Sequence, residues 1–276
     1  MRSWLPIGGP PGNPDSRRLA GYHDNNGCGR MSVRFTKALV IGASSGIGEA
    51  IARQLAAEGC QVALVARRPA ELERLRAERP DRFGVYVHDV RQPDEAPELF
   101  ERIVRDLGGL DLLVYAAGVL AKVAEGEYAF DKDREMIEVN LVGAMAWMNL
   151  AAARFQAART GTILGISSIA GERGRRGNPG YGTSKAALTA YLEALRNRCS
   201  RYGVNVATAK PGFVATPMTH GMGKLLWMIP ADDAARQCLA IARKGTSASG
   251  FVPKRWGLVA QVIRNIPSLV FRRMNF

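Results

Sequence analysis

Runs of apolar residues alternate with amphipathic segments along most of this chain. The apolar runs are KALVIG (37–42), QVALVA (61–66), GVYVHDV (84–90), DLLVYAAG (111–118), GTILGISS (161–168) and VNVATAKPG (204–212). They are short and nearly all apolar, as strands of a parallel sheet covered on both faces must be. Segments of helical length separate them, so the pattern predicts repeated βαβ units. We expect an α/β protein with a doubly wound parallel sheet, a Rossmann fold, in a single domain over residues 31–250.

The two ends of the chain depart from this rhythm. Residues 1–30 are rich in glycine, proline and asparagine without periodicity, which predicts a disordered extension. Residues 251–276 carry five basic residues and no acidic one, beside apolar residues at helical spacing. Such a basic amphipathic segment favours peripheral contact with an anionic membrane. Packing on the domain or on a second subunit is the alternative.

Composition and charge narrow the classes of function. Hydrophobic residues make up 47% of the 276 residues, enough for one large core, and the net charge of +13 suits an anionic partner. We recognise no nucleic-acid-binding module, so nucleic acid is disfavoured as that partner. The four cysteines and three histidines are scattered, which predicts no metal site and fits a reduced, cytoplasmic compartment. The longest apolar run, 143–153, is too short to span a membrane, and the N-terminus lacks the apolar core of a signal peptide.

A glycine-rich turn joins the first predicted strand to the first helix. The sequence VIGASSGIGEAIA places Gly42, Gly46 and Gly48 there. Gly42 permits a tight turn, and the other two glycines let the backbone approach a pyrophosphate at the helix N-terminus. A turn without a ligand is the alternative, but the position between strand and helix favours a dinucleotide site.

The end of the second strand indicates which dinucleotide is bound. NAD-binding folds place an acidic residue there for the ribose 2′-hydroxyl, whereas this chain has Arg67 and Arg68. Guanidinium groups suit the 2′-phosphate of NADP(H), and Ser44 offers a hydroxyl to the same phosphate. We therefore expect NADP(H), with a solvated basic loop as the alternative.

A tyrosine and a lysine stand four residues apart in GYGTSKAAL (180–188). Four is the helical spacing that brings Tyr181 and Lys185 to one face. Ser168 ends a predicted strand thirteen residues before Tyr181, and Asn140 lies on the preceding helix. The tyrosine–lysine pair alone is common in helices, but together with the glycine-rich turn it predicts a catalytic site.

With these motifs the chain resembles the short-chain dehydrogenase/reductase family over residues 35–250. Further shared features are Asp89-Val90 after the third strand, Ala117-Gly118 after the fourth, and the segment PGFVATPM. The resemblance implies a cofactor site made of Gly42, Ser44, Ser45, Gly46, Ile47, Gly48, Arg67, Arg68, Asp89, Val90, Ala117, Gly118, Tyr181, Lys185, Pro211, Gly212, Val214 and Thr216.

The resemblance also implies catalytic roles for four residues. Tyr181 would give its proton to a ketone oxygen, and Lys185 would favour the resulting phenolate and hold the nicotinamide ribose. Ser168 would stabilise charge on the substrate oxygen, and Asn140 would anchor a water that links Lys185 to solvent. The implied activity is reduction of a ketone to a secondary alcohol by NADPH. A non-catalytic NADP-binding regulatory module is the alternative from another class, although such modules should have lost the tyrosine or the lysine.

Two positions depart from the family pattern. Ile41 replaces the usual threonine before Gly42, and YAAG at 115–118 replaces Asn-Asn-Ala-Gly. In the family these two segments brace each other by hydrogen bonds. We expect packing to replace that brace here.

Two segments bear on the substrate. The loop GERGRRGNP carries Arg173, Arg175 and Arg176 near the expected mouth of the site, where they would recognise phosphate or another anion; a solvated basic loop is the alternative. Together with the basic tail, this loop is similar to the decaprenylphosphoryl-2-keto-erythro-pentose reductases, which implies a lipid-linked keto sugar and a place at the inner face of the membrane. A 3-oxoacyl or small-ketone reductase is the alternative. The family usually pairs the helices that carry Asn140 and Tyr181 between subunits, which implies a homodimer or homotetramer.

Overall fold

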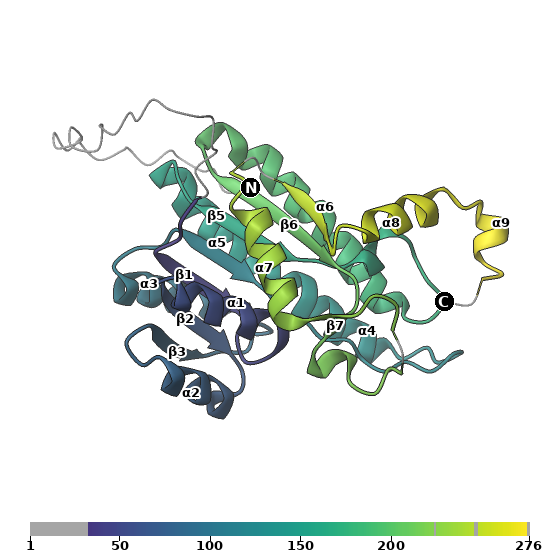
Figure 1. Cartoon of the computed structure of the whole chain (residues 1–276), viewed down its shortest axis with the longest axis horizontal. Helices are drawn as coiled ribbons and strands as arrows, with labels where there is room; N and C mark the ends of the chain where they lie inside the picture. The colour runs from purple at the N-terminus through teal and green to yellow at the C-terminus, as the bar shows by residue number, and fades with distance from the viewer. Residues whose placement is uncertain (1–32, 224, 246–247, 275–276) are drawn as a thin grey trace, which may run out of the picture. The chain divides into compact units, whose positions relative to one another are not determined.

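The computed structural model of the protein describes residues 33–223, 225–245 and 248–274, and in them seven parallel strands form one sheet in the order β3-β2-β1-β4-β5-β6-β9 (Figure 1). The predicted disordered extension, 1–30, lies outside the described residues. The strands of this sheet are β1 (Lys37–Ile41), β2 (Gln61–Ala66), β3 (Phe83–Val87), β4 (Leu112–Tyr115), β5 (Thr162–Ile166), β6 (Asn205–Pro211) and β9 (Ser249–Val252).

Each of the six predicted apolar runs forms a strand. Apart from β2, these strands end one to three residues before the predicted boundary, because the residues that follow them turn into loops at the carboxyl edge of the sheet. The seventh strand, β9, was not predicted. It is an edge strand beside β6 with one buried residue among its four, Val252, so no apolar run marks it. It also crosses the boundary between residues 250 and 251, where the sequence placed the end of the domain and the start of the tail.

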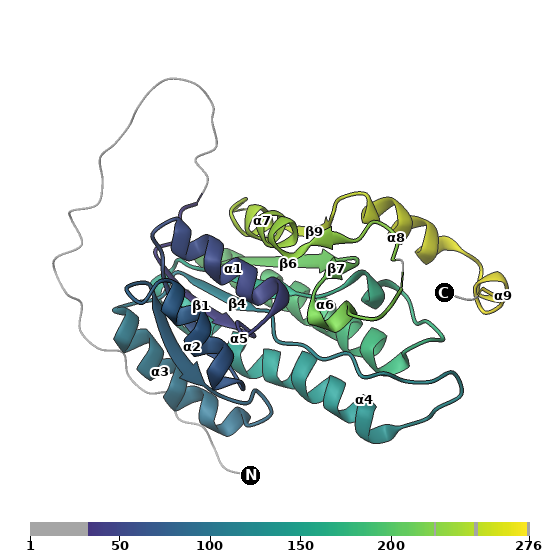
Figure 2. The same ribbon diagram turned by 60° about the horizontal axis from the view of Figure 1, so that its bottom comes forward.

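Helices cover both faces of the sheet (Figure 2). One face carries α1 (Gly46–Ala57), α2 (Pro69–Glu78) and α7 (Ala231–Ala242), and the other carries α3 (Ala96–Leu107), α5 (Gly143–Ala158) and α6 (Pro179–Cys199). Successive residues of β1 alternate between the two cores, Val40 on the first and Ile41 on the second. This two-sided burial explains why the strands read as continuous apolar runs.

The topology places a crevice at the carboxyl ends of β1 and β4. Ile41 pairs with Val65 of β2 on one side and with Tyr115 of β4 on the other. The chain therefore builds β2 and β3 on one side of β1, and then crosses back to add β4 and the later strands on the other side. Doubly wound sheets bind ligands at such a reversal of strand order.

A continuous helical stretch precedes β5. The helix α4 (Phe130–Ile137) passes through the π-helical turn η2 (Glu138–Val142) into α5. By length and composition Phe130–Ala158 is apolar enough to cross a membrane, but half of its most apolar window is buried inside the protein. Burial of that kind is expected of a core helix.

The C-terminal segment packs on the domain with one face. After β9 the chain forms α8 (Trp256–Asn265) and α9 (Ser268–Phe271), at the end of the molecule away from α2 and α3 (Figure 1). Trp256 and Ile263 of α8 are buried, and Trp256 packs in a small core with Ile169. Leu258 and Val262 face outward, at 76% and 63% exposure. Part of the predicted amphipathic face thus packs on its own domain.

Candidate active site

A cavity of about 330 Å³ opens at the carboxyl edge of the sheet, with the glycine-rich loop among its walls and Trp256 of α8 also lining it. The predicted site residues that line it are Gly42, Ser44, Ser45, Gly46, Ile47, Arg67, Arg68, Val90, Ala117, Gly118, Ser168, Tyr181, Lys185, Pro211, Gly212, Val214 and Thr216. Three other predicted residues, Gly48, Asp89 and Asn140, are not part of its lining. Across the described residues, no group of three histidine, cysteine, aspartate or glutamate side chains is placed to hold a metal ion.

The glycine-rich loop has no room for side chains at two of its positions. Gly42 has a φ of 88°, and a Cβ atom there would lie 2.4 Å from the backbone nitrogen of Ala117. A Cβ atom at Gly48 would lie 2.3 Å from the carbonyl oxygen of Gly42. The loop leads directly into the N-terminus of α1, whose cap residue Ser45 makes no side-chain capping bond. Free amide groups beside such a narrow loop fit the pyrophosphate of a dinucleotide.

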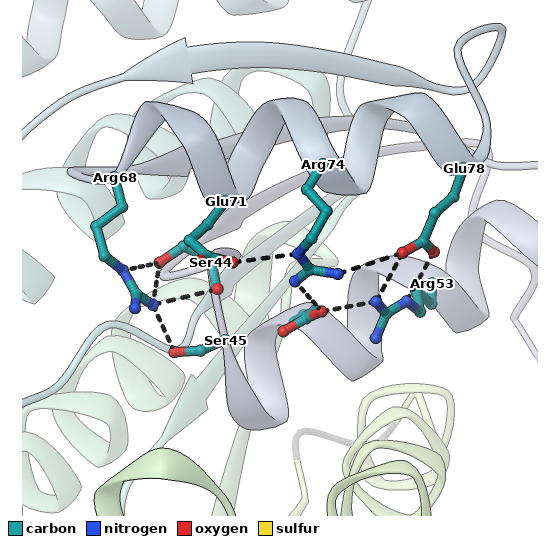
Figure 3. A network of polar contacts seen from close by, with 8 residues as sticks. Ser44, Ser45, Arg53, Arg68, Glu71, Arg74 and Glu78 are labelled. Carbon is teal, nitrogen blue, oxygen red and sulfur yellow. Dashed lines mark hydrogen bonds and ion pairs between the residues drawn. The ribbon is translucent and has the colours of Figure 1, made fainter.

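Arg68 is attached to this loop by several hydrogen bonds (Figure 3). Its Nη2 atom donates to the hydroxyl of Ser44 at 2.9 Å, to the carbonyl of Ser44 at 3.1 Å and to the hydroxyl of Ser45 at 2.8 Å. Arg67 is looser, with a side chain 45% exposed and Nη1 3.8 Å from Asp89 Oδ2. The two arginines therefore differ in how firmly they are held beside the loop, a difference that the dipeptide alone does not reveal.

An ion-pair network next to Arg68 connects α1 to α2 (Figure 3). Arg53 of α1 donates to both carboxylate oxygens of Glu78 of α2, at 2.8 and 2.7 Å. Arg74 of α2 reaches back to Glu49 of α1 at 2.7 Å. These bonds fix the helix that follows Arg68 relative to the helix that starts at the glycine-rich loop.

Asp89 is turned toward a neighbouring arginine. Its carboxylate accepts from the backbone nitrogen of Arg91 at 3.0 Å and from Arg91 Nη2 at 2.6 Å, and these bonds hold the pKa of Asp89 below its usual value. The flanking residues His88 and Val90 line the cavity instead. The contact with the cofactor that the resemblance implies for Asp89 stays a prediction, and in this structure the carboxylate is paired with Arg91.

Tyr181 and Lys185 lie in the first turns of α6. Asn178 caps this helix: its Oδ1 accepts from the backbone nitrogen of Tyr181 at 3.0 Å, and its Nδ2 donates to the carbonyl of Ala121 at 2.8 Å. The cap fixes the start of α6, so Lys185 follows one turn later, with Nζ 5.9 Å from the centroid of the Tyr181 ring. Ser168 follows β5, and its hydroxyl accepts from the backbone nitrogen of Ala170 at 3.0 Å.

Burial shifts the proton affinities of both side chains. Lys185 is 4% exposed, its ammonium donates to the carbonyl of Ile166 at 3.0 Å, and burial lowers its pKa to about 8. Burial raises the pKa of Tyr181, while a hydrogen bond with Ser168 and the charge of Arg175 act against that rise. Lys185 therefore loses its proton before Tyr181 does, and near neutral pH Tyr181 is a phenol that can donate a proton.

Asn140 is fully buried within the π-helical turn η2. Its side chain accepts from the backbone nitrogen of Val119 at 2.8 Å and donates to the carbonyl of Val119 at 3.0 Å and to the hydroxyl of Ser184 at 2.9 Å. These bonds tie the loop after β4 to α6 beside Lys185. Asn140 is thus placed to hold the wall that carries Gly118.

Tyr115, which stands where the family has an asparagine, makes a buried hydrogen bond of its own. The Tyr115 ring is fully buried, and its hydroxyl donates to the carbonyl of Val139 in η2 at 2.6 Å. Ile41 and Tyr115 are paired neighbours in the sheet and both are fully buried, as expected if packing replaces the family's brace, while the Tyr115 hydroxyl bonds to a different segment. A tyrosine is long enough to reach the next layer, so the bond runs to the turn that carries Asn140.

The three arginines of the loop before α6 have three different environments. Arg173 donates to the carbonyls of Ile263 (2.6 Å) and Ile266 and lies over the ring of Phe271, so it holds the C-terminal segment. Arg176 pairs with Glu125 on the surface at 3.0 Å. Arg175 lines the cavity. The expectation of a shared role in substrate recognition is thus wrong for Arg173, whose guanidinium is committed to α8.

Trp256 is a wall residue that the sequence did not reveal. It is 5% exposed and lines the cavity, and a Cβ atom at Gly212 would lie 2.0 Å from its indole Nε1. No motif marks such a contact, because it joins residues far apart in the chain. Phe213 packs edge-on against Trp256 with ring centroids 5.6 Å apart, which makes this end of the cavity aromatic.

The chain belongs to the short chain dehydrogenase family of oxidoreductases, whose model matches residues 36–225. It is 35% identical over 191 residues to an uncharacterized oxidoreductase of Myxococcus xanthus, covering 68% of this chain and 75% of that protein. It is 29% identical over 249 residues to an uncharacterized oxidoreductase of Mycobacterium tuberculosis, covering 87% of this chain and 98% of that protein.

Solved structures share the fold. A short chain dehydrogenase/reductase family protein superposes with a TM-score of 0.72 at 25% identity, over 80% of this chain and 97% of the other. The structure of ElxO with NADP bound superposes with a TM-score of 0.72 at 21% identity, over 80% of this chain and 99% of the other. The predicted doubly wound fold is confirmed.

Proposed function

We propose that the protein reduces a ketone to a secondary alcohol with NADPH, as an enzyme of this family. The observation that carries the proposal is the convergence of Ser168, Tyr181 and Lys185 on one cavity with a glycine-rich loop. NADPH, when bound, would supply the hydride. Gly42, Ser45 and the start of α1 would hold its pyrophosphate. Pro211, Gly212, Val214, Thr216 and Lys185 would hold its nicotinamide end.

The protein's own side chains would handle the proton. Tyr181, a phenol near neutral pH, would give its proton to the ketone oxygen. Ser168 would donate a hydrogen bond to the same oxygen as charge develops there. Lys185, charged below a pKa of about 8, would stabilise the phenolate left behind. Asn140 would keep Lys185 in contact with the water that returns the proton.

The direct test is NADPH oxidation against a panel of ketones, with Tyr181→Phe as the control. We expect turnover with the wild type and a loss of roughly 10²- to 10⁴-fold in kcat for the variant, because the acid is removed. NADPH binding, followed by fluorescence, should be retained by Tyr181→Phe. A wild type that binds NADPH but turns over no ketone would instead support a regulatory module, and a fully active variant would contradict the role of Tyr181.

The preference for NADP(H) is argued from Arg68. Its guanidinium is already held by Ser44 and Ser45, so a 2′-phosphate would meet an ordered cation. We expect Arg68→Ala to lower kcat/KM for NADPH by roughly 10- to 100-fold and to leave NADH nearly unaffected. Arg67→Ala is the matched control, with a smaller effect because its side chain is 45% exposed. Equal wild-type rates with NADH and NADPH would contradict the proposal.

Within this function, an amphipathic or lipid-linked ketone such as a polyprenyl-phosphate keto sugar is the proposed substrate, taken at the inner face of the membrane. The support is the outer face of α8 and α9, where Leu258, Val262, Leu269 and Val270 are 52–76% exposed, followed by Arg272 and Arg273. We expect the protein to sediment with anionic vesicles and to do so less after Leu269→Ser and Val270→Ser. Two results together would contradict the membrane-bound substrate: the protein does not sediment with the vesicles, and the Leu269→Ser, Val270→Ser variant reduces lipid-linked and soluble ketones at the wild-type rates.

A further inference from the structure

Arg175 is a partly buried cation at the reacting end of the cavity. It lies six residues before Tyr181 and lines the same cavity as Ser168 and Tyr181. Its Nε atom is buried and makes no hydrogen bond, and its Nη2 atom lies 3.5 Å from the carbonyl oxygen of Ile169. In the part of the chain that the structure describes, Arg175 has no carboxylate partner.

This environment differs from that of the neighbouring arginines. Arg173 is satisfied by backbone carbonyls of α8, and Arg176 is paired with Glu125. A charge that is removed from water without a partner lowers stability, so buried charges are normally paired. Arginine stays protonated under all ordinary conditions and cannot escape this cost by losing its proton. An anion that enters the cavity would supply the missing partner.

The location of Arg175 indicates which molecule would bring that anion. Arg68, the cation proposed for the cofactor phosphate, is held on the glycine-rich loop, whereas the charge of Arg175 acts on Tyr181. Ile169, whose carbonyl lies 3.5 Å from Arg175, packs with Trp256 and Phe213, and all three apolar residues line the cavity. Ser168 and Tyr181 are engaged by the ketone oxygen in the proposed reaction, which leaves Arg175 for another part of the substrate.

We propose that Arg175 binds an anionic group, a carboxylate or a phosphate, on the ketone substrate. The inference rests on the proposed function for the identity of the reacting group. The apolar walls would accept the carbon skeleton between the ketone and the anion. The guanidinium would fix the distance between the two, and so would select among ketones by where their charge lies.

Binding is tested first, on the NADP⁺-loaded protein, by quenching of tryptophan fluorescence. The ligands are acetoacetate and levulinate, each compared with its methyl ester, and dihydroxyacetone phosphate compared with dihydroxyacetone. For at least one of these pairs we expect the anion to bind at least roughly tenfold more tightly than its neutral counterpart. This difference in affinity should disappear in Arg175→Met and Arg175→Gln. Arg176→Met is the matched control and should keep the gap. The better of the carboxylate and phosphate pairs identifies the anion.

Turnover of the same pairs separates this proposal from the proposed function. We expect Arg175→Met to lower kcat/KM for the charged ketone by roughly 10- to 100-fold and for the neutral one by less than about threefold, with partial rescue by Arg175→Lys. Equal losses on charged and neutral ketones, or anions that bind no better than neutral ligands, would overturn the subsite. Turnover without a charge preference would leave the reductase standing and remove the subsite. Arg175-dependent anion binding without any turnover would support the subsite and contradict the proposed reductase function.

Discussion

At the scale of single residues, Lys185 has a position that favours function over stability. Its ammonium is 4% exposed and bonded to one backbone carbonyl, which does not replace the water it has lost. Burial lowers its pKa from 10.5 to about 8, so the charged form is disfavoured by folding. The proposed reaction needs that charge beside Tyr181.

We predict that Lys185→Met abolishes turnover and raises the free energy of unfolding by about 1–3 kcal/mol near pH 7. The sign follows from the lowered pKa: the cost of burying the ammonium is fully present below a pH of about 8 and disappears as the pH rises toward 10.5. The gain should therefore shrink in alkaline solution. Urea denaturation near pH 7 and near pH 10 measures it, with the exposed Lys254→Met as control. A variant that is less stable than the wild type at both pH values would refute the argument.

Tyr115→Phe isolates the hydrogen bond between the end of β4 and η2. We predict a loss of about 1–2 kcal/mol in unfolding free energy, because the carbonyl of Val139 is left buried without its 2.6 Å partner. Tyr86→Phe, which removes a more exposed hydroxyl bonded to Asp106, is the control and should cost less. Thermal and urea unfolding of both variants gives the comparison. Equal effects would mean that the Tyr115 bond contributes nothing beyond packing.

At the scale of elements, the sequence predicted those features that depend on residues close together in the chain. The strands β1 to β6, the glycine-rich turn and the Tyr181–Lys185 pair depend on neighbours within a few residues, so periodicity and spacing reveal them. The edge strand β9 and the inward face of α8 depend on distant partners. Arg173 has the same residue type and the same loop as Arg175, and only the position of α8 separates their roles.

Arg173 is expected to hold α8 on the loop that precedes Tyr181. We predict that Arg173→Ala speeds amide hydrogen exchange in α8 and lowers the local free energy of opening by about 1–3 kcal/mol, because carbonyls near the C-terminus of the helix lose a charged donor. Exchange in α1 should not change. Arg176→Ala, whose ion pair lies on the surface, is the matched control. Unchanged exchange in α8 would show that apolar packing alone holds the helix.

At the scale of the whole molecule, the two ends of the cavity come from different parts of the chain. The glycine-rich loop follows β1 and Arg68 follows β2, near the start of the chain. The cavity that Arg175 lines also includes Trp256, which lies near the other end of the chain. The family model ends at residue 225, before α7, β9 and α8. The end proposed for the cofactor therefore lies within the family match, whereas the end near Arg175 also includes Trp256, which lies outside it.

Self-association is a prediction at this scale. The family resemblance implies a homodimer or homotetramer that pairs α5 and α6 with their copies. On α5 the apolar residues Leu150, Ala153 and Ala157 line a groove, together with the polar residues Glu101 of α3, Asn149 and Arg154. Ala153→Arg should shift the mass measured by light scattering after gel filtration toward the monomer. Ala77→Arg, at an exposed position of α2, should leave it unchanged. A monomeric wild type would contradict the prediction.

The contact between Trp256 and Gly212 has a consequence for the order in which the protein becomes active during synthesis. The ribosome makes the glycine-rich loop, Ser168, Tyr181 and Lys185 well before Trp256. A growing chain can therefore assemble the proposed cofactor site while the aromatic wall formed by Trp256 is still missing. We expect the cofactor to be the first ligand that a nascent chain can hold, and to stabilise it until α8 arrives to close the pocket.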